Sequence, residues 1–182
     1  MSETQTATAS FASTIARGCK VSMGLAEMLL KDVHPGTFAR SIKLDGTRID
    51  ANHPAFVYGH LSLYPARIVS MLGGDASDIT PSEHLKELFE AGKDSVDDAD
   101  GTIYPSMGEI TGAFFRGYER AMETVSALDD ARLAEPNPVE GRLREMFPTL
   151  GGALLFVLND HPMFHLGQVS TWRRCMGLGP VM

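Results

Sequence analysis

The sequence is poor in cysteine. Its 182 residues include only Cys19 and Cys175, which lie far apart along the chain. A framework of disulfide bonds is therefore excluded as the main source of stability. We expect both cysteines to be small, buried side chains.

Positive charge is also in deficit. The chain has 16 basic and 23 acidic residues, which gives a formal net charge of −7, and its isoelectric point is about 5.3. Binding to a phosphate backbone depends on an excess of positive charge. We therefore expect no nucleic-acid partner.

Long apolar runs are absent from the sequence. No run approaches the ~20 residues that a membrane-spanning helix needs. The opening segment MSETQTATAS contains an acidic residue and has neither the basic nor the apolar region of a signal peptide. We expect a soluble, cytoplasmic protein without membrane contact.

The composition that is present is typical of one globular domain. Hydrophobic residues make up 43% of the chain, an ordinary share for a folded protein, and the length lies in the range of a single domain. We expect residues 1–9 to form a flexible N-terminal tail and residues 10–182 to fold as one domain.

Helical periodicity dominates the sequence, and no segment shows the alternation of a β-strand. Capping residues, glycines and prolines mark where the helices begin and end. Pro65 lies inside the second helix and should kink it. The sequence predicts four long helices over residues 10–32, 52–72, 105–128 and 147–176.

The second and third helices are joined by a long crossover. Within it, Thr80-Pro81-Ser82-Glu83 predicts a capping box that starts a short extra helix. The acidic residues 93–102 do not match the spacing of a calcium loop, so we interpret them as a solvated turn. The pattern predicts an all-α four-helix bundle in which the crossover lets the second and third helices run parallel.

Histidines in two of these helices suggest a metal site. His161 and His165 are four residues apart in HPMFH, which puts both imidazoles on one face of the last helix. A third ligand is needed, and His60 can face the bundle interior from the second helix. Three imidazoles with an open fourth position are typical of a catalytic zinc site.

The same residues carry a family resemblance. YGHL at residues 58–61 and HPMFHLGQVSTWRR at residues 161–174 resemble the GHL and HxxxHxGQ segments of the DinB/YfiT-like metalloenzymes. DGTIYPS before the third helix and RRCMGLGP at the end add to the likeness, which covers the chain from residue 10 onward. The resemblance implies a four-helix bundle that binds one divalent metal ion through three histidines.

Residue by residue, the resemblance assigns the metal to His60, His161 and His165. Members of the family include bacillithiol transferases and a mycothiol-dependent maleylpyruvate isomerase. By analogy, we expect a metal-dependent transferase or isomerase that acts on a small molecule through a low-molecular-weight thiol. Zinc is the expected metal and nickel the next candidate. A homodimer is compatible with such a bundle.

Several questions stay open at the level of sequence. Asp160 and Gln168 could orient the ligand imidazoles, and Tyr58 and Glu109 could line a pocket, but each could equally be a cap or a surface polar residue. The substrate and the general base are not identified. The alternative function is a non-catalytic helical bundle that metal stabilises, or a module that binds another protein.

Overall fold

The computed structural model describes residues 10–181, so the tail predicted at residues 1–9 lies outside the described range. Within that range the chain is mostly helical, and its strands form one small hairpin. The all-α prediction is therefore confirmed.

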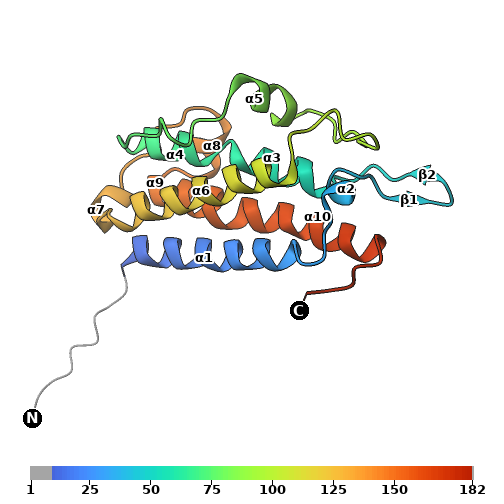
Figure 1. The fold of residues 1–182 in the computed structure, drawn as a ribbon. Coiled ribbons are helices and arrows are strands. Elements are labelled where there is room, and N and C mark those ends of the chain that lie inside the picture. The colour runs from blue at the N-terminus through green and yellow to red at the C-terminus, as the bar shows by residue number, and fades with distance from the viewer. Residues whose placement is uncertain (1–9, 182) are drawn as a thin grey trace, which may run out of the picture.

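Four long helical segments make up the body of the molecule (Figure 1). The second and third run in one direction, and the first and last run in the opposite direction. A long crossover permits this order. The segments are α1 (Phe11–Leu29), α3 (Pro54–Ser62) with α4 (Pro65–Met71), α6 (Met107–Ser126), and α9 (Leu150–Leu155) with the π-helical η1 (Phe156–Asp160) and α10 (His161–Cys175).

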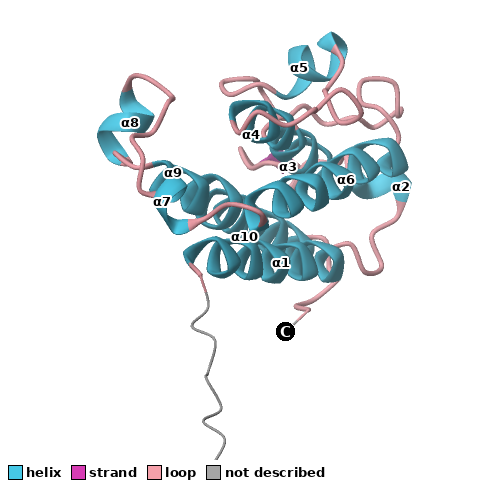
Figure 2. Ribbon diagram, turned by 90° about the vertical axis from the view of Figure 1, so that its left-hand side faces the viewer, coloured by secondary structure: helices cyan, strands magenta, loops and turns pink. Residues whose placement is uncertain are grey.

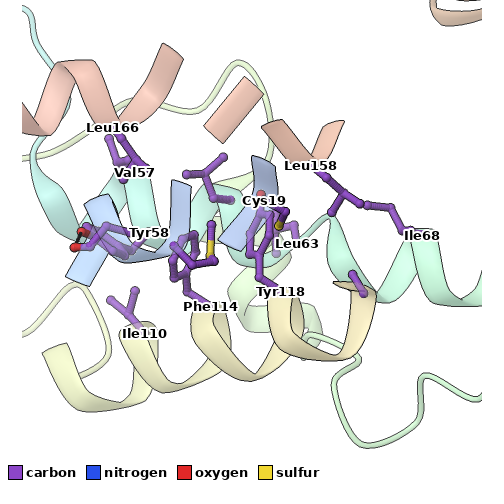
Figure 3. Packing of buried hydrophobic residues seen from close by; sticks show 14 of the residues in the cluster. Cys19, Val57, Tyr58, Leu63, Ile68, Ile110, Phe114, Tyr118, Leu158 and Leu166 are labelled. Atoms are coloured by element: carbon purple, nitrogen blue, oxygen red, sulfur yellow. Dashed lines mark hydrogen bonds between the residues drawn. The ribbon is translucent and has the colours of Figure 1, made fainter. Parts of the chain in front are cut away.

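The hydrophobic core lies among α1, α3, α6 and α10. The helices α1 and α6 each begin at a serine cap and bury one apolar stripe. The ring of Phe114 on α6 packs edge-on against the ring of Tyr58 on α3, with centroids 4.9 Å apart (Figure 3). Burial of these apolar faces fixes the positions of α3 and α10 relative to each other.

Pro65 divides the second long segment. The prediction of a single kinked helix over residues 52–72 is wrong, because α3 ends at Ser62 and α4 begins at Pro65. Proline has no N–H, and its ring clashes with the preceding turn of a helix. The proline ring packs against Gly117 of α6, where a Cβ would lie 3.0 Å from it. The break leaves Tyr64 at the junction between the two helices.

The crossover contains the predicted extra helix, α5 (Glu83–Phe89). Its first turn differs from the prediction, because the cap is Ser82, whose hydroxyl accepts a hydrogen bond from the N–H of Leu85. Thr80 lies outside the helix. The helix α5 packs mainly against α3, so the crossover covers the helix that carries His60.

Most of residues 93–102 are exposed, as a solvated turn requires, but two of the carboxylates are held by hydrogen bonds. Asp97 accepts a hydrogen bond from Arg40 at 2.8 Å. The carboxylate of Asp98 accepts one from the N–H of Thr102 at 2.9 Å. These bonds fix the course of the loop as it leaves α5.

Short elements complete the described chain. The prediction that no segment forms a strand is wrong at one antiparallel hairpin, where Asp45 and Gly46 have positive φ angles of 49° and 79°. An Asp-Gly pair is the sequence signal for such a turn. The elements are α2 (Pro35–Phe38), β1 (Lys43–Leu44), β2 (Thr47–Arg48), α7 (Asp130–Leu133) and α8 (Arg142–Met146).

The structure also bears on the expectations drawn from composition. Among the helices within residues 10–181, none combines the length and the apolar character that crossing a bilayer requires. Both cysteines are free thiols. Cys19 is buried as predicted, and burial raises its pKa to about 12, but Cys175 is exposed at the end of α10, so its predicted burial is wrong.

Candidate metal centre

His60 lies in the last turn of α3. The helix begins at Pro54 behind a cap formed by His53, whose Nδ1 accepts a hydrogen bond from the N–H of Phe56 at 3.2 Å. A cap followed by proline at the first helical position fixes where the helix starts. His60 is buried, on a helix that packs against α10.

His161 and His165 belong to α10, which follows directly after η1. A π-helical turn is wider than an α-turn and shifts the phase of the residues that follow it. Asn159 in this turn donates a hydrogen bond to the carbonyl oxygen of Ile15 on α1 at 3.3 Å. The π segment is thus anchored to α1 just before the first ligand, and His165 lies one turn beyond His161 on the same face.

The three imidazoles meet at one point. The ring of His60 lies 5.5 Å from that of His161 and 4.9 Å from that of His165, and the latter two rings are 4.7 Å apart. One ring nitrogen of each lies within 4.8 Å of the others. Nitrogens bound to one tetrahedral zinc ion are about 3.4 Å apart, so shifts of about 1 Å would complete the coordination.

Two of the three rings are oriented by hydrogen bonds. The Nδ1–H of His60 donates to the carbonyl oxygen of Phe89 at 2.8 Å. The Nδ1–H of His165 donates to Oε1 of Gln168 at 3.4 Å, and Asn52 donates to the same oxygen at 3.0 Å. With Nδ1 protonated in this way, Nε2 is the nitrogen that can bind a metal.

The third ring has a buried nitrogen without a partner. Nδ1 of His161 is inaccessible to solvent and forms no hydrogen bond within the described residues. A buried polar atom in that state is costly unless something binds it. Three imidazole nitrogens within 4.8 Å of one another are a donor set that fits a divalent metal ion such as zinc, and the ring of His161 is not committed to a hydrogen bond through Nδ1.

Burial lowers the pKa of all three histidines. The pKa of His161 falls to about 3 and that of His165 to about 4, chiefly because burial disfavours the charged ring, with a smaller effect of the neighbouring imidazoles. The pKa of His60 is also lowered by burial, in spite of its hydrogen bond to Phe89. The rings are therefore neutral near pH 7, the state that binds metal.

One side of the cluster faces a pocket. The Tyr64 hydroxyl donates a hydrogen bond to Nε2 of His60 at 3.2 Å, and its ring lies 4.6 Å from that of His161. Both Tyr64 and His161 line an adjacent pocket of about 450 Å³. The other walls of this pocket come from α4, α9, η1 and the region of α8, which lies across from α4 in Figure 2.

The predicted accessory residues have different outcomes. Gln168 accepts a hydrogen bond from the ring of His165. It can therefore orient a candidate ligand, which is one of the two roles considered for it. Asp160 is exposed at the end of η1 and forms no side-chain hydrogen bond within residues 10–181. Tyr58 is buried in the core, where its hydroxyl donates to the carbonyl oxygen of Ala26 at 2.6 Å. Glu109 is the partner in a capping box at the start of α6, so neither lines the pocket.

Sequence reasoning missed Tyr64 and Phe89. Tyr64 follows His60 by four residues, a spacing that would have placed it beside the ligand on a helix. Phe89 contributes its backbone carbonyl. Every residue has such a carbonyl, so the residue type gives no signal of this role. Its position depends on how the crossover folds back over α3.

Comparison of the chain with protein-family models and with curated protein sequences finds no match.

Proposed function

We propose that the chain is a metal-dependent enzyme, a transferase or isomerase that acts on a small molecule through a low-molecular-weight thiol. The supporting observation is that three neutral imidazoles converge and that one of them, His161, lines an apolar pocket. In this proposal the helical body is a four-helix bundle of the DinB/YfiT type. His60, His161 and His165 hold the metal, with zinc as the first candidate and nickel as the second.

Each ligand has a defined task in this proposal. The hydrogen bonds to Phe89 and Gln168 hold His60 and His165 in the tautomer that presents Nε2. A divalent ion bound there would lower the pKa of a thiol so that the thiolate forms near pH 7. In a transfer reaction the sulfur forms the new bond to carbon, the leaving group takes the electrons of the broken bond, and the thiol proton passes to solvent.

Tyr64 and the pocket serve the substrate. The Tyr64 hydroxyl donates to Nε2 of His60 at the edge of the pocket, so a metal bound at Nε2 would release this donor for a hydrogen bond to a reacting group. The pocket has the size and the apolar lining that small-molecule sites commonly show. Its apolar walls exclude water and strengthen the electrostatic interactions at the centre.

The alternative function is a bundle that metal only stabilises. A purely structural zinc site has four protein ligands, whereas the cluster found among the described residues offers three. One of the three ligands, His161, lines a pocket, and within residues 10–181 no fourth ligand in this cluster closes the site. This arrangement favours a catalytic role over a purely stabilising one.

The test is the rate of thiol transfer at a loaded centre. Zinc-loaded wild type, His161→Ala and the control His84→Ala are assayed with several low-molecular-weight thiols and an electrophile such as 1-chloro-2,4-dinitrobenzene. His84 is exposed on α5, so its loss should leave the rate unchanged. Loss of at least about 100-fold in His161→Ala supports the proposal. Equal rates in all three proteins would support the non-catalytic alternative.

A further inference from the structure

The pocket beside His161 is apolar over most of its surface. Aliphatic and aromatic side chains form its walls, on α4, on α9 and η1, and near α8. They include Ile68, Met71, Leu143, Leu154, Phe156 and Val157. Such walls bind an apolar body by removing its surface from water.

Arg67 is the exception. Among the pocket-lining residues, all of which lie within residues 10–181, it alone carries a permanent charge. It projects from α4, and its guanidinium carbon lies 5.8 Å from the centre of the Tyr64 ring. Tyr64 in turn packs against His161, so one aromatic ring contacts both the cation and the ligand cluster.

The guanidinium is not fully engaged within the protein. Within residues 10–181 its one ion pair is with Glu90 at 3.7 Å, and the two side chains are 61% and 49% exposed. Exposed pairs of this kind contribute little, because water and salt screen them. A ligand anion can therefore compete for Arg67, which has a planar fork of donors suited to carboxylate, sulfonate or phosphate oxygens.

We infer that this pocket binds a small apolar molecule with a single anionic group, the anion at Arg67 and the apolar body against α9 and η1. Bound in this way, the part of the molecule nearest His161 and Tyr64 is presented to the metal centre. The inference rests on the proposed function only in that it names the substrate class. Binding itself requires the pocket and Arg67, not the metal.

Two fluorescent probes test the inference on the full chain. 1-Anilinonaphthalene-8-sulfonate and N-phenyl-1-naphthylamine share one aromatic skeleton, and only the first carries an anion. Both are titrated into wild type, Arg67→Gln, Met71→Trp and the control Arg17→Gln. Arg17 is exposed on α1, away from the pocket. Circular dichroism verifies that each variant is folded.

In Arg67→Gln the sulfonate probe should bind about fivefold more weakly, and the uncharged probe should change by less than about twofold. Met71→Trp, which fills the pocket, should weaken both probes, and Arg17→Gln should weaken neither. Equal losses of both probes in Arg67→Gln, or no loss of either, would overturn the inference. This comparison decides the matter even if Met71→Trp does not fold, because Arg67 is an exposed side chain.

The two proposals can fail separately. If the selective effect of Arg67→Gln persists in metal-free protein but no thiol reaction occurs, the binding inference stands and the proposed function fails. If zinc-loaded protein transfers thiols while Arg67→Gln affects both probes alike, the proposed function stands and the binding inference fails.

Discussion

Nδ1 of His60 donates a hydrogen bond to the carbonyl oxygen of Phe89 at 2.8 Å. His60 is on α3, whereas Phe89 is the last residue of α5 in the crossover. The crossover thus does more than connect two helices, because it sets the tautomer and the angle of a candidate ligand. The ring of Phe89 also packs closely against Gly59, the residue before His60. This packing helps to hold the Phe89 carbonyl in place for the hydrogen bond to His60.

Gly59→Ala should disturb this contact. A Cβ at position 59 would lie 2.5 Å from the Phe89 ring, so the ring and its carbonyl must move. We expect a loss of about 1–3 kcal/mol in the free energy of unfolding and about tenfold weaker zinc binding. Chemical denaturation and competition with a zinc indicator measure the two effects.

The matched control is Gly167→Ala on α10. Nothing lies within 4 Å of a Cβ there, and alanine favours a helix by about 0.5–1 kcal/mol over glycine. This variant should be as stable as wild type or more so. If both alanine variants keep the wild-type zinc affinity, the role given to Phe89 is wrong.

Gln168 provides a second test of ring orientation. Its Oε1 accepts hydrogen bonds from His165 and from Asn52. Gln168→Met keeps a similar length but removes the acceptor, so zinc should bind about 10–100-fold more weakly. Gln168→Glu keeps an acceptor and should retain most of the affinity. Equal affinities for the Met and Glu variants would show that this oxygen does not support His165.

The placement of the π segment can be tested at Gly18. A Cβ on this α1 residue would lie 2.0 Å from Oδ1 of Asn159, the side chain that anchors η1 to α1. We expect Gly18→Ala to destabilise the protein by about 1–3 kcal/mol and to weaken zinc binding, because His161 follows two residues later.

Gly24→Ala is the control on the same helix. A Cβ at this position meets nothing within 4 Å, so thermal unfolding should show no loss of stability. If Gly18→Ala were as stable as Gly24→Ala, the tight contact between α1 and η1 would not exist in solution.

His53 should make stability depend on pH. Burial is the main cause that lowers its pKa from 6.5 to about 4. As the pH falls, the unfolded chain therefore takes up a proton before the folded chain does. The stability due to neutral His53 is complete above about pH 6.5 and is lost toward pH 4, by about 3 kcal/mol.

His53→Asn retains a capping side chain but cannot titrate. Between pH 6.5 and pH 4 it should therefore lose about 3 kcal/mol less unfolding free energy than wild type. His34→Asn, at an exposed position, should follow wild type. Urea unfolding at several pH values measures this, and identical pH profiles for His53→Asn and wild type would contradict it.

The sequence was informative where local rules decide the structure. Helical periodicity located the long helices, and the four-residue spacing of His161 and His165 placed both on one face.

Pro65 was recognised as a disruption, but whether it kinks or ends a helix depends on packing, here against Gly117. Pro162 likewise indicates a kink in the last helix or a break after Asp160, and η1 lies at that place. Its π-helical form could not be predicted, because it depends on the contact of Asn159 with α1.

In the candidate site, too, local rules predict some features and long-range packing decides the others. His60 could be placed on the inner face of a helix, and the family resemblance joined it to the other two histidines. The carbonyl of Phe89 and the pocket around Arg67 depend on segments that meet only in the folded chain. Long-range contacts of backbone atoms leave no pattern in a single sequence.

The most direct test of the metal centre is the metal content of the chain, expressed without a histidine tag and purified without a nickel column. Elemental analysis should find about one equivalent of zinc or nickel in wild type and less than about 0.2 in His165→Ala. The His84→Ala control should match wild type. Less than about 0.2 equivalents in wild type, or unchanged content in His165→Ala, would contradict a metal centre at His60, His161 and His165.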